Sequence, residues 1–182
     1  GIHSGSLTIS GSTVNATGGD SGNGYYSDGG SGIGSSGGVT ISGGSTVTAN
    51  GGNGGSLVGG DGIRSGGGLT VSDGTVTAKG GNDDSKDGYG GDGIRSGGVV
   101  TISGNTVNAA GGYGICSFDR VAISGGTVEA AGGNGSTGGG SGIYSNDIDL
   151  SGSLELTAKA GSPNGKALSQ KGSELDPNTF KE

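Results

Sequence analysis

The chain has little cysteine, proline, aromatic residue or positive charge. Its 182 residues include one cysteine, two prolines, no methionine and no tryptophan, and aromatic residues make up 4%. The lone Cys116 excludes an internal disulfide. No apolar stretch approaches the ~20 residues that a bilayer span requires, so membrane insertion is not expected. The formal net charge of −7 disfavours nucleic acid and anionic membranes, which attract basic patches, and it permits cation binding.

Glycine is the residue in excess, at 51 of 182 positions. The absence of a Gly-X-Y period and the two prolines exclude collagen. A hydrophobic content of 27% would ordinarily indicate disorder. The few apolar residues nevertheless stand at fixed places in a repeat, which indicates a folded array.

The repeat begins with Gly-Ile, any residue, and Ser. A β-branched run follows, then a second run that usually ends in alanine, and then a glycine-rich break. Self-similarity of this kind is typical of repeat architectures, in which no unit buries its apolar face alone. The six copies begin at Gly1, Gly32, Gly62, Gly93, Gly114 and Gly142.

The shortest copy, residues 93–113, defines the minimal coil as three short strands separated by glycine-rich turns. Alternation of side chains turns Val100 and Ile102 of the second strand into the coil and Thr101 outward. In the third strand it turns Val107 inward. The sequence therefore predicts an all-β fold. We expect a right-handed parallel β-helix of about six rungs, with three short strands in each rung.

Stacked rungs would align identical positions in columns. One aliphatic column is expected to contain Ile2, Ile33, Ile63, Ile94, Ile115 and Ile143. A serine column, which alternation also places inside, contains Ser4, Ser35, Ser65, Ser96, Ser117 and Ser145. A buried hydroxyl needs a hydrogen-bond partner. We interpret these serines as bonded to neighbouring backbone rather than catalytic, because no histidine or other base recurs beside them.

Differences in length fall almost wholly after the third strand. The long loops are 18–31, 51–61, 80–92 and 132–141, whereas the copy at 93–113 has none. Either these loops decorate one binding edge of the solenoid, or glycine loops merely drift in length. Tyrosine stacks on sugar rings, although exposed loop tyrosines often only pack locally. The tyrosines that we consider for carbohydrate binding are Tyr25, Tyr26, Tyr89 and Tyr113.

One loop resembles half of a calcium site. Asp83, Ser85 and Asp87 offer oxygen ligands at alternate positions, and Gly88 stands sixth. The usual Glu at position 12 is absent, and Asp92 could replace it. We therefore expect Ca2+ as a cofactor, with a solvated acidic loop as the alternative. The candidate ligands are Asp83, Ser85, Asp87, Asp92 and Asp61.

Two consecutive copies carry Asp-Gly-Ile-Arg. Stacking would place Asp61 near Asp92 and Arg64 near Arg95, about 5 Å apart. Each arginine could pair with a neighbouring carboxylate, or both could bind a carboxylate from outside. Arg64 and Arg95 therefore join the carbohydrate-binding candidates.

These repeats resemble those of a known class of proteins. Residues 91–109 are similar to the repeats of secreted carbohydrate-binding-domain β-helix proteins of Gram-positive bacteria, and to glycine-rich repeats in large surface proteins of gut Firmicutes. The resemblance extends from Gly1 to about Ala160. It implies a fold similar to that of pectate lyases and a location at the bacterial cell surface. It also implies binding of calcium and acidic polysaccharide without cleavage of the polysaccharide. This chain departs in its higher glycine content and in having Asp before Gly-Ile in only two copies.

The expected function is a non-catalytic extracellular module. It would bind a polysaccharide or a cell-surface glycan, which includes an acidic glycan bound together with calcium. Otherwise it would serve as a structural adhesin stalk. A polysaccharide lyase is one alternative, with Arg64 and Arg95 beside Asp61 and Asp92 as its candidate group. An ice-binding β-helix is another, because Thr-x-Thr rows occur at 46–48 and 75–77.

The two ends of the chain differ. Residues 1–160 form the predicted β-helix, and residues 161–182, which break the repeat, are expected to form a cap or tail over the last rung. The chain begins directly in a strand. We therefore expect further rungs of the same parent chain upstream.

Overall fold

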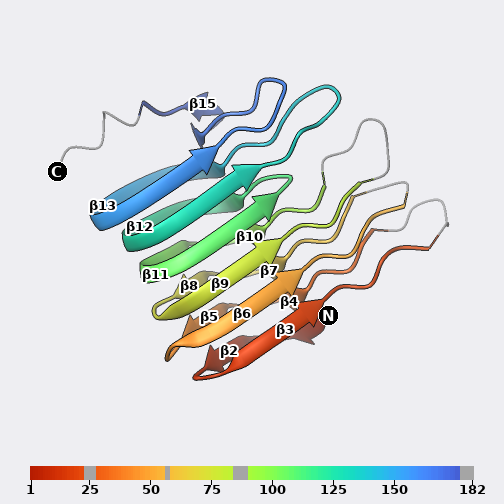
Figure 1. Cartoon of the computed structure of the whole chain (residues 1–182), viewed down its shortest axis with the longest axis vertical. Helices are drawn as coiled ribbons and strands as arrows, with labels where there is room; N and C mark the ends of the chain where they lie inside the picture. Colours follow the sequence, from red (N-terminus) through yellow and green to blue (C-terminus); the bar gives the residue numbers. More distant parts are fainter. Residues whose placement is uncertain (23–27, 56–57, 84–89, 177–182) are drawn as a thin grey trace.

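The computed structural model describes residues 1–22, 28–55, 58–83 and 90–176. All regular elements in this part of the chain are strands, and they wind into a β-solenoid (Figure 1). In Figure 1 the nearer strands run from lower left to upper right as the chain climbs from its N-terminus. The coil is therefore a right-handed parallel β-helix, as predicted.

Each rung contributes one strand to each of three columns. The first column contains β1 (Ile2–Ser4), β4 (Ile33–Ser35), β7 (Ile63–Ser65), β10 (Ile94–Ser96), the starts of β12 (Ile115–Gly132) and β13 (Ile143–Lys159), and β14 (Leu168–Gln170). The second contains β2 (Leu7–Ser10), β5 (Val39–Ser42), β8 (Leu69–Val71), the start of β11 (Val100–Gly111) and the middle parts of β12 and β13. The third contains β3 (Thr13–Thr17), β6 (Ser45–Asn50), β9 (Gly74–Lys79) and the later parts of β11, β12 and β13.

The columns have the predicted register. In the first column Ile94 pairs with Ile63 on one side and with Ile115 on the other. All three side chains are fully buried, whereas Ile2 in the first rung is only partly buried because no described rung covers it. The aliphatic columns thus form one continuous thin core along the solenoid axis.

The inward serines bond to backbone carbonyls of the preceding rung. The Oγ of Ser96 donates to the Gly67 carbonyl at 2.8 Å, and that of Ser117 donates to the Gly98 carbonyl at 2.9 Å. The buried hydroxyls thus find backbone acceptors in the turns, and the Gly67 carbonyl also accepts from the Gly98 amide at 3.0 Å. The expectation that these serines bond to neighbouring backbone is confirmed.

The glycine-rich loops share a common base in register. We call the segment that leaves the third column the outgoing arm and the segment that enters the first column the returning arm. The amide of Gly60 donates to the Gly52 carbonyl, and the amide of Gly81 donates to the Gly60 carbonyl, both at 2.8 Å. Similar bonds continue from rung to rung and link outgoing and returning arms alternately, except between Gly112 and Gly133, which both lie in outgoing segments. Their successive members are Gly19, Gly30, Gly52, Gly60, Gly81, Gly91, Gly112, Gly133, Gly140, Gly161 and Gly165.

The arms lie too close together for side chains. A Cβ on Gly81 would collide with the Gly52 carbonyl of the preceding rung. Gly19 occupies the same repeat position in the first rung, and a Cβ there would meet no atom within 4 Å. Much of the glycine content is therefore explained by close packing of backbone against backbone.

The C-terminal segment covers the first column of the last rung. Leu168 is buried and pairs with Ile143, and Leu175 packs against the core from beyond β15 (Ser173–Glu174), which is antiparallel to β14. The Oε1 of Gln170 accepts a hydrogen bond from the Ile148 amide at 3.1 Å. Residues 177–182, which include Phe180, lie outside the described part.

The close packing of the arms can be tested with matched alanines. Gly81→Ala should lower the free energy of unfolding by about 1–3 kcal/mol, because its Cβ forces two rungs apart. Gly19→Ala should change it little, or raise it by about 0.4–1 kcal/mol through a less flexible unfolded chain. Denaturant unfolding of both variants is the measurement. Equal effects in the two would contradict the packing assignment.

Candidate functional site

The outer face of the first column carries a row of unlike side chains. In register from the N-terminal rung upward they are His3, Gly34, Arg64, Arg95, Cys116, Tyr144 and Ser169. Arg64 and Arg95 are neighbours in this row, as predicted. The other two columns present mostly threonine, serine and asparagine, so the chemically diverse side chains gather on this face.

Each arginine pairs with the aspartate three residues before it. Arg95 lies 3.3 Å from Asp92, and Arg64 lies 3.8 Å from Asp61. The Arg95 guanidinium also lies 5.0 Å from the ring centroid of Phe118, a cation–π arrangement. The Arg64 side chain is more open, at 63% exposure against 37% for Arg95. Pairing with a neighbouring carboxylate is thus the arrangement that the fold adopts.

The two aspartates are buried and link consecutive rungs. A carboxylate oxygen of Asp61 accepts a hydrogen bond from the Asp92 amide at 2.8 Å, and one of Asp92 accepts from the Tyr113 amide at 2.8 Å. Both side chains therefore act as main-chain acceptors inside the stack. Their oxygens are engaged by amides and arginines of the chain itself.

Burial governs the protonation of this cluster. Desolvation, reinforced by the nearby Asp61 charge, raises the pKa of Asp92 to about 6, and its hydrogen bond with Tyr113 and the charge of Arg95 oppose the shift. Desolvation also raises the pKa of Asp61. The pKa of Cys116 rises to about 12 for the same main reason. Its buried thiol therefore stays protonated and unreactive at neutral pH.

An aromatic platform lies at the upper end of this face. The rings of Tyr113 and Tyr144 stack with centroids 5.1 Å apart and an interplanar angle of 28°. Phe118, whose ring lies beside Arg95 of this face, is 50% exposed. We call Tyr113, Phe118 and Tyr144 the aromatic platform. Tyr113 was expected from the sequence to bind carbohydrate, whereas Phe118 and Tyr144 were not.

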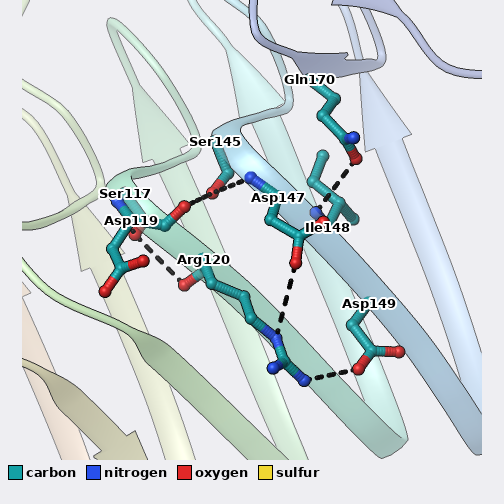
Figure 2. A network of polar contacts seen from close by, with 8 residues as sticks. All are labelled: Ser117, Asp119, Arg120, Ser145, Asp147, Ile148, Asp149 and Gln170. Carbon is teal, nitrogen blue, oxygen red and sulfur yellow. Dashed lines mark hydrogen bonds and ion pairs between the residues drawn. The ribbon is translucent and has the colours of Figure 1, made fainter.

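A polar network borders the platform where the first column turns into the second. Figure 2 shows Arg120 between Asp147 and Asp149, with N–O distances of 3.9 and 2.6 Å. Next to it the Asn146 amide group donates to the Phe118 carbonyl. Earlier rungs have glycine-rich turns here, at 37–38 and 66–68. Their replacement by charged residues in the last rungs was the sequence signal for this cluster.

Two hollows open beside the glycine arms. One, of about 670 Å³, lies at the rung without a long loop and is flanked by the arms at 80–83 and 132–134. The other, of about 690 Å³, lies above Gly34 between His3 and Arg64. The first hollow lies where the short rung lacks the loop that its neighbours have. The second lies where Gly34 lacks the side chain that His3 and Arg64 have.

Several predicted positions lie outside the described residues. They are Tyr25, Tyr26, Ser85, Tyr89 and Asp87. Of the other calcium candidates, Asp83 forms an isolated bridge with Gly54, and Asp61 and Asp92 have the partners given above. Within the described ranges no three His, Cys, Asp or Glu side chains are grouped to hold a metal ion. Calcium binding stays a prediction.

Comparison with known proteins gives no relative. No family model, no curated protein and no solved structure matches the chain. The described part also contains no helix long and apolar enough to cross a membrane.

The buried aspartates predict a specific pH dependence of stability. The pKa of Asp92 is about 6 when folded against 3.8 for an ordinary aspartate, so between these values the folded chain holds more protons than the unfolded chain. The contribution of Asp92 to the free energy of unfolding should therefore fall as the pH rises from about 4 to about 6, by up to about 3 kcal/mol, and then level off.

Asp92→Asn isolates this contribution. Asparagine keeps an oxygen for the Tyr113 amide but cannot ionise. In the variant the free energy of unfolding should therefore fall less as the pH rises from about 4 to about 6. Urea unfolding of both proteins at about pH 4 and about pH 7 measures the difference. The same pH dependence in both would show that Asp92 titrates normally.

Proposed function

We propose that this chain is a non-catalytic extracellular surface module that binds carbohydrate on the outer face of its first column. The aromatic platform is the observation on which this rests. Sugar rings present C–H groups that pack on aromatic faces, and tyrosine adds a hydroxyl for hydrogen bonding. The solenoid holds the three rings on the strand and turn segments of three consecutive rungs, so little ordering is needed on binding.

Charged groups beside the platform suit a polar ligand. Arg95 lies against Phe118, and Arg120 with its two aspartates lies at the adjoining turn. These exposed groups can exchange hydrogen bonds with sugar hydroxyls or with a carboxylate of an acidic glycan. The proposal thus includes acidic glycans, with calcium as a cofactor bound in the loop that contains Asp83.

A lyase is less well supported by the same geometry. Such an enzyme needs free carboxylates to hold calcium and a cationic base above the sugar acid. Asp61 and Asp92 instead turn inward to backbone amides, and both arginines pair with them. The buried positions of these aspartates favour a structural role, in which they hold consecutive rungs together.

A glycan array probed with the full chain, with and without calcium, tests the proposal. Phe118→Ala and Tyr144→Ala should each weaken binding of the selected glycan by about three- to tenfold, the usual worth of one aromatic contact. Val58→Ala removes an exposed apolar side chain in the loop of an earlier rung and should have no effect. No bound glycan, or binding that ignores both substitutions, would leave the adhesin-stalk role in its place.

Ice binding is a second candidate, favoured by the register of the third column. Its outward row repeats threonine through five consecutive rungs, Thr13, Thr46, Thr75, Thr106 and Thr127. Evenly spaced hydroxyl and methyl groups on a flat sheet can order a layer of water that continues into ice. Hydroxyl side chains with this spacing also follow from β propensity alone.

Thermal hysteresis of the full chain tests this second function. The chain should depress the growth temperature of ice crystals, and Thr75→Lys should abolish the effect because a long charged side chain disrupts the row. Thr70→Lys, in the second column of the same rung, should leave it intact. A chain that never slows ice growth excludes this candidate.

A further inference from the structure

Asparagine is followed directly by glycine at several places in this chain. The pairs begin at Asn23, Asn50, Asn53, Asn134 and Asn164, of which Asn23 lies outside the described residues. An asparagine in such a pair can lose its side-chain amide without an enzyme, because glycine has no Cβ to hinder attack by its own backbone nitrogen. That nitrogen must leave its hydrogen bond and reach the asparagine side chain. The fold therefore decides which pair can react.

In three of the described pairs the glycine amide ties two rungs together. These hydrogen bonds run from the Gly51 amide to the Lys79 carbonyl at 2.8 Å, from Gly54 to Asn82 at 2.9 Å and from Gly135 to Ser162 at 3.0 Å. Each acceptor belongs to the following rung. To free any of these nitrogens, two backbones would have to part that neighbouring hydrogen bonds keep in register.

The asparagines of these three pairs are themselves held. Asn53 Oδ1 accepts from the Asn82 amide at 3.0 Å, and Asn134 Oδ1 accepts from the Ser162 amide at 2.7 Å. Asn50 is the last residue of β6, which pairs with β3 on one side and with β9 on the other. An asparagine held in this way cannot bring its Cγ to the following nitrogen. We call these three the closed pairs.

The pair at Asn164 is open by comparison. It lies in the blue loop that follows β13 in Figure 1, within an exposed turn at 162–164. The Gly165 amide donates to the Gly161 carbonyl at 3.0 Å, inside the same loop, so this bond can break without parting two rungs. The Asn164 side chain has no hydrogen-bond partner among the described residues. Both the nucleophile and the side chain are thus accessible to each other.

We propose that Asn164 is a site of spontaneous deamidation in the folded chain. The Gly165 nitrogen attacks Cγ of Asn164 and forms a C–N bond, while the side-chain nitrogen leaves as ammonia with the proton that the Gly165 amide gives up. Water then opens the cyclic imide at either carbonyl and leaves aspartate or isoaspartate at this position. Water is the only co-reactant. The site is remote from the aromatic platform in the sequence and does not depend on carbohydrate binding.

The isoaspartate product should loosen the C-terminal cap. It inserts an extra carbon into the main chain just before Gly165, where space is lacking, because a Cβ on Gly165 would already collide with the carbonyls of Gly161 and Gly140. A few residues further on, Leu168 is buried and pairs with Ile143 of the last rung. A shift of the chain at Gly165 therefore disturbs the packing of β14 on β13.

Peptide mapping by mass spectrometry, after incubation of the full chain at mildly alkaline pH, tests the proposal. Asn164 should convert at least about fivefold faster than the closed pairs, which must first break a hydrogen bond between rungs. In urea, where the fold is lost, all four pairs should convert at similar rates. Equal rates in the folded chain, or no conversion of Asn164, would overturn the proposal. So would an equal preference for Asn164 in urea, because local sequence would then be its cause.

Asn164→Gly tests the effect on the cap. Glycine suits the φ of 62° at this position and has no side chain to react. Urea unfolding should show that incubation lowers the free energy of unfolding of the original chain and leaves that of Asn164→Gly unchanged. Asn53→Ala removes a closed pair instead, and it should lose stability on incubation as the original chain does. An equal loss in Asn164→Gly would overturn the link between this modification and the cap.

Discussion

The main-chain hydrogen bonds between rungs constrain everything else in this protein. Neighbouring rungs must keep one strand spacing around the whole circumference, in the strands and in the bases of the loops alike. In the strands this spacing stacks identical residues, such as Ile63, Ile94 and Ile115. In the arms the same spacing leaves no room for Cβ atoms, so glycine recurs where the backbones of two rungs meet.

Polar side chains complete the hydrogen bonds that the backbone cannot make. Inward serines reach turn carbonyls, and Asp61, Asp92 and Asn53 accept amides of the following rung. An unsatisfied buried amide or carbonyl would be costly, and these side chains remove that cost at recurring positions. The raised pKa of Asp92 follows from this role, because a carboxylate that replaces a backbone carbonyl must share its burial.

The candidate sites arise where the repeat changes. The aromatic platform and its polar border appear where glycine-rich turns give way to Phe118, Arg120 and Asp147, and the hollow of about 670 Å³ lies where one long loop is missing. Regular rungs supply a straight and rigid scaffold on which such changes are held in place. In a repeat solenoid the departures from the repeat are therefore the places where binding is expected.

The sequence by itself determined the columns. Side-chain alternation of period two, repeated in six copies, leaves one register that turns all the aliphatic columns inward, so the fold, the core and the serine column followed from it. It left open whether Arg64 and Arg95 pair internally, and it suggested neither the glycine arms nor the aromatic platform. Those depend on contacts between backbone or side chains of different rungs, which no periodic pattern encodes. Only the tertiary structure decided them, because bringing Tyr113 onto Tyr144 requires the spacing of the assembled stack.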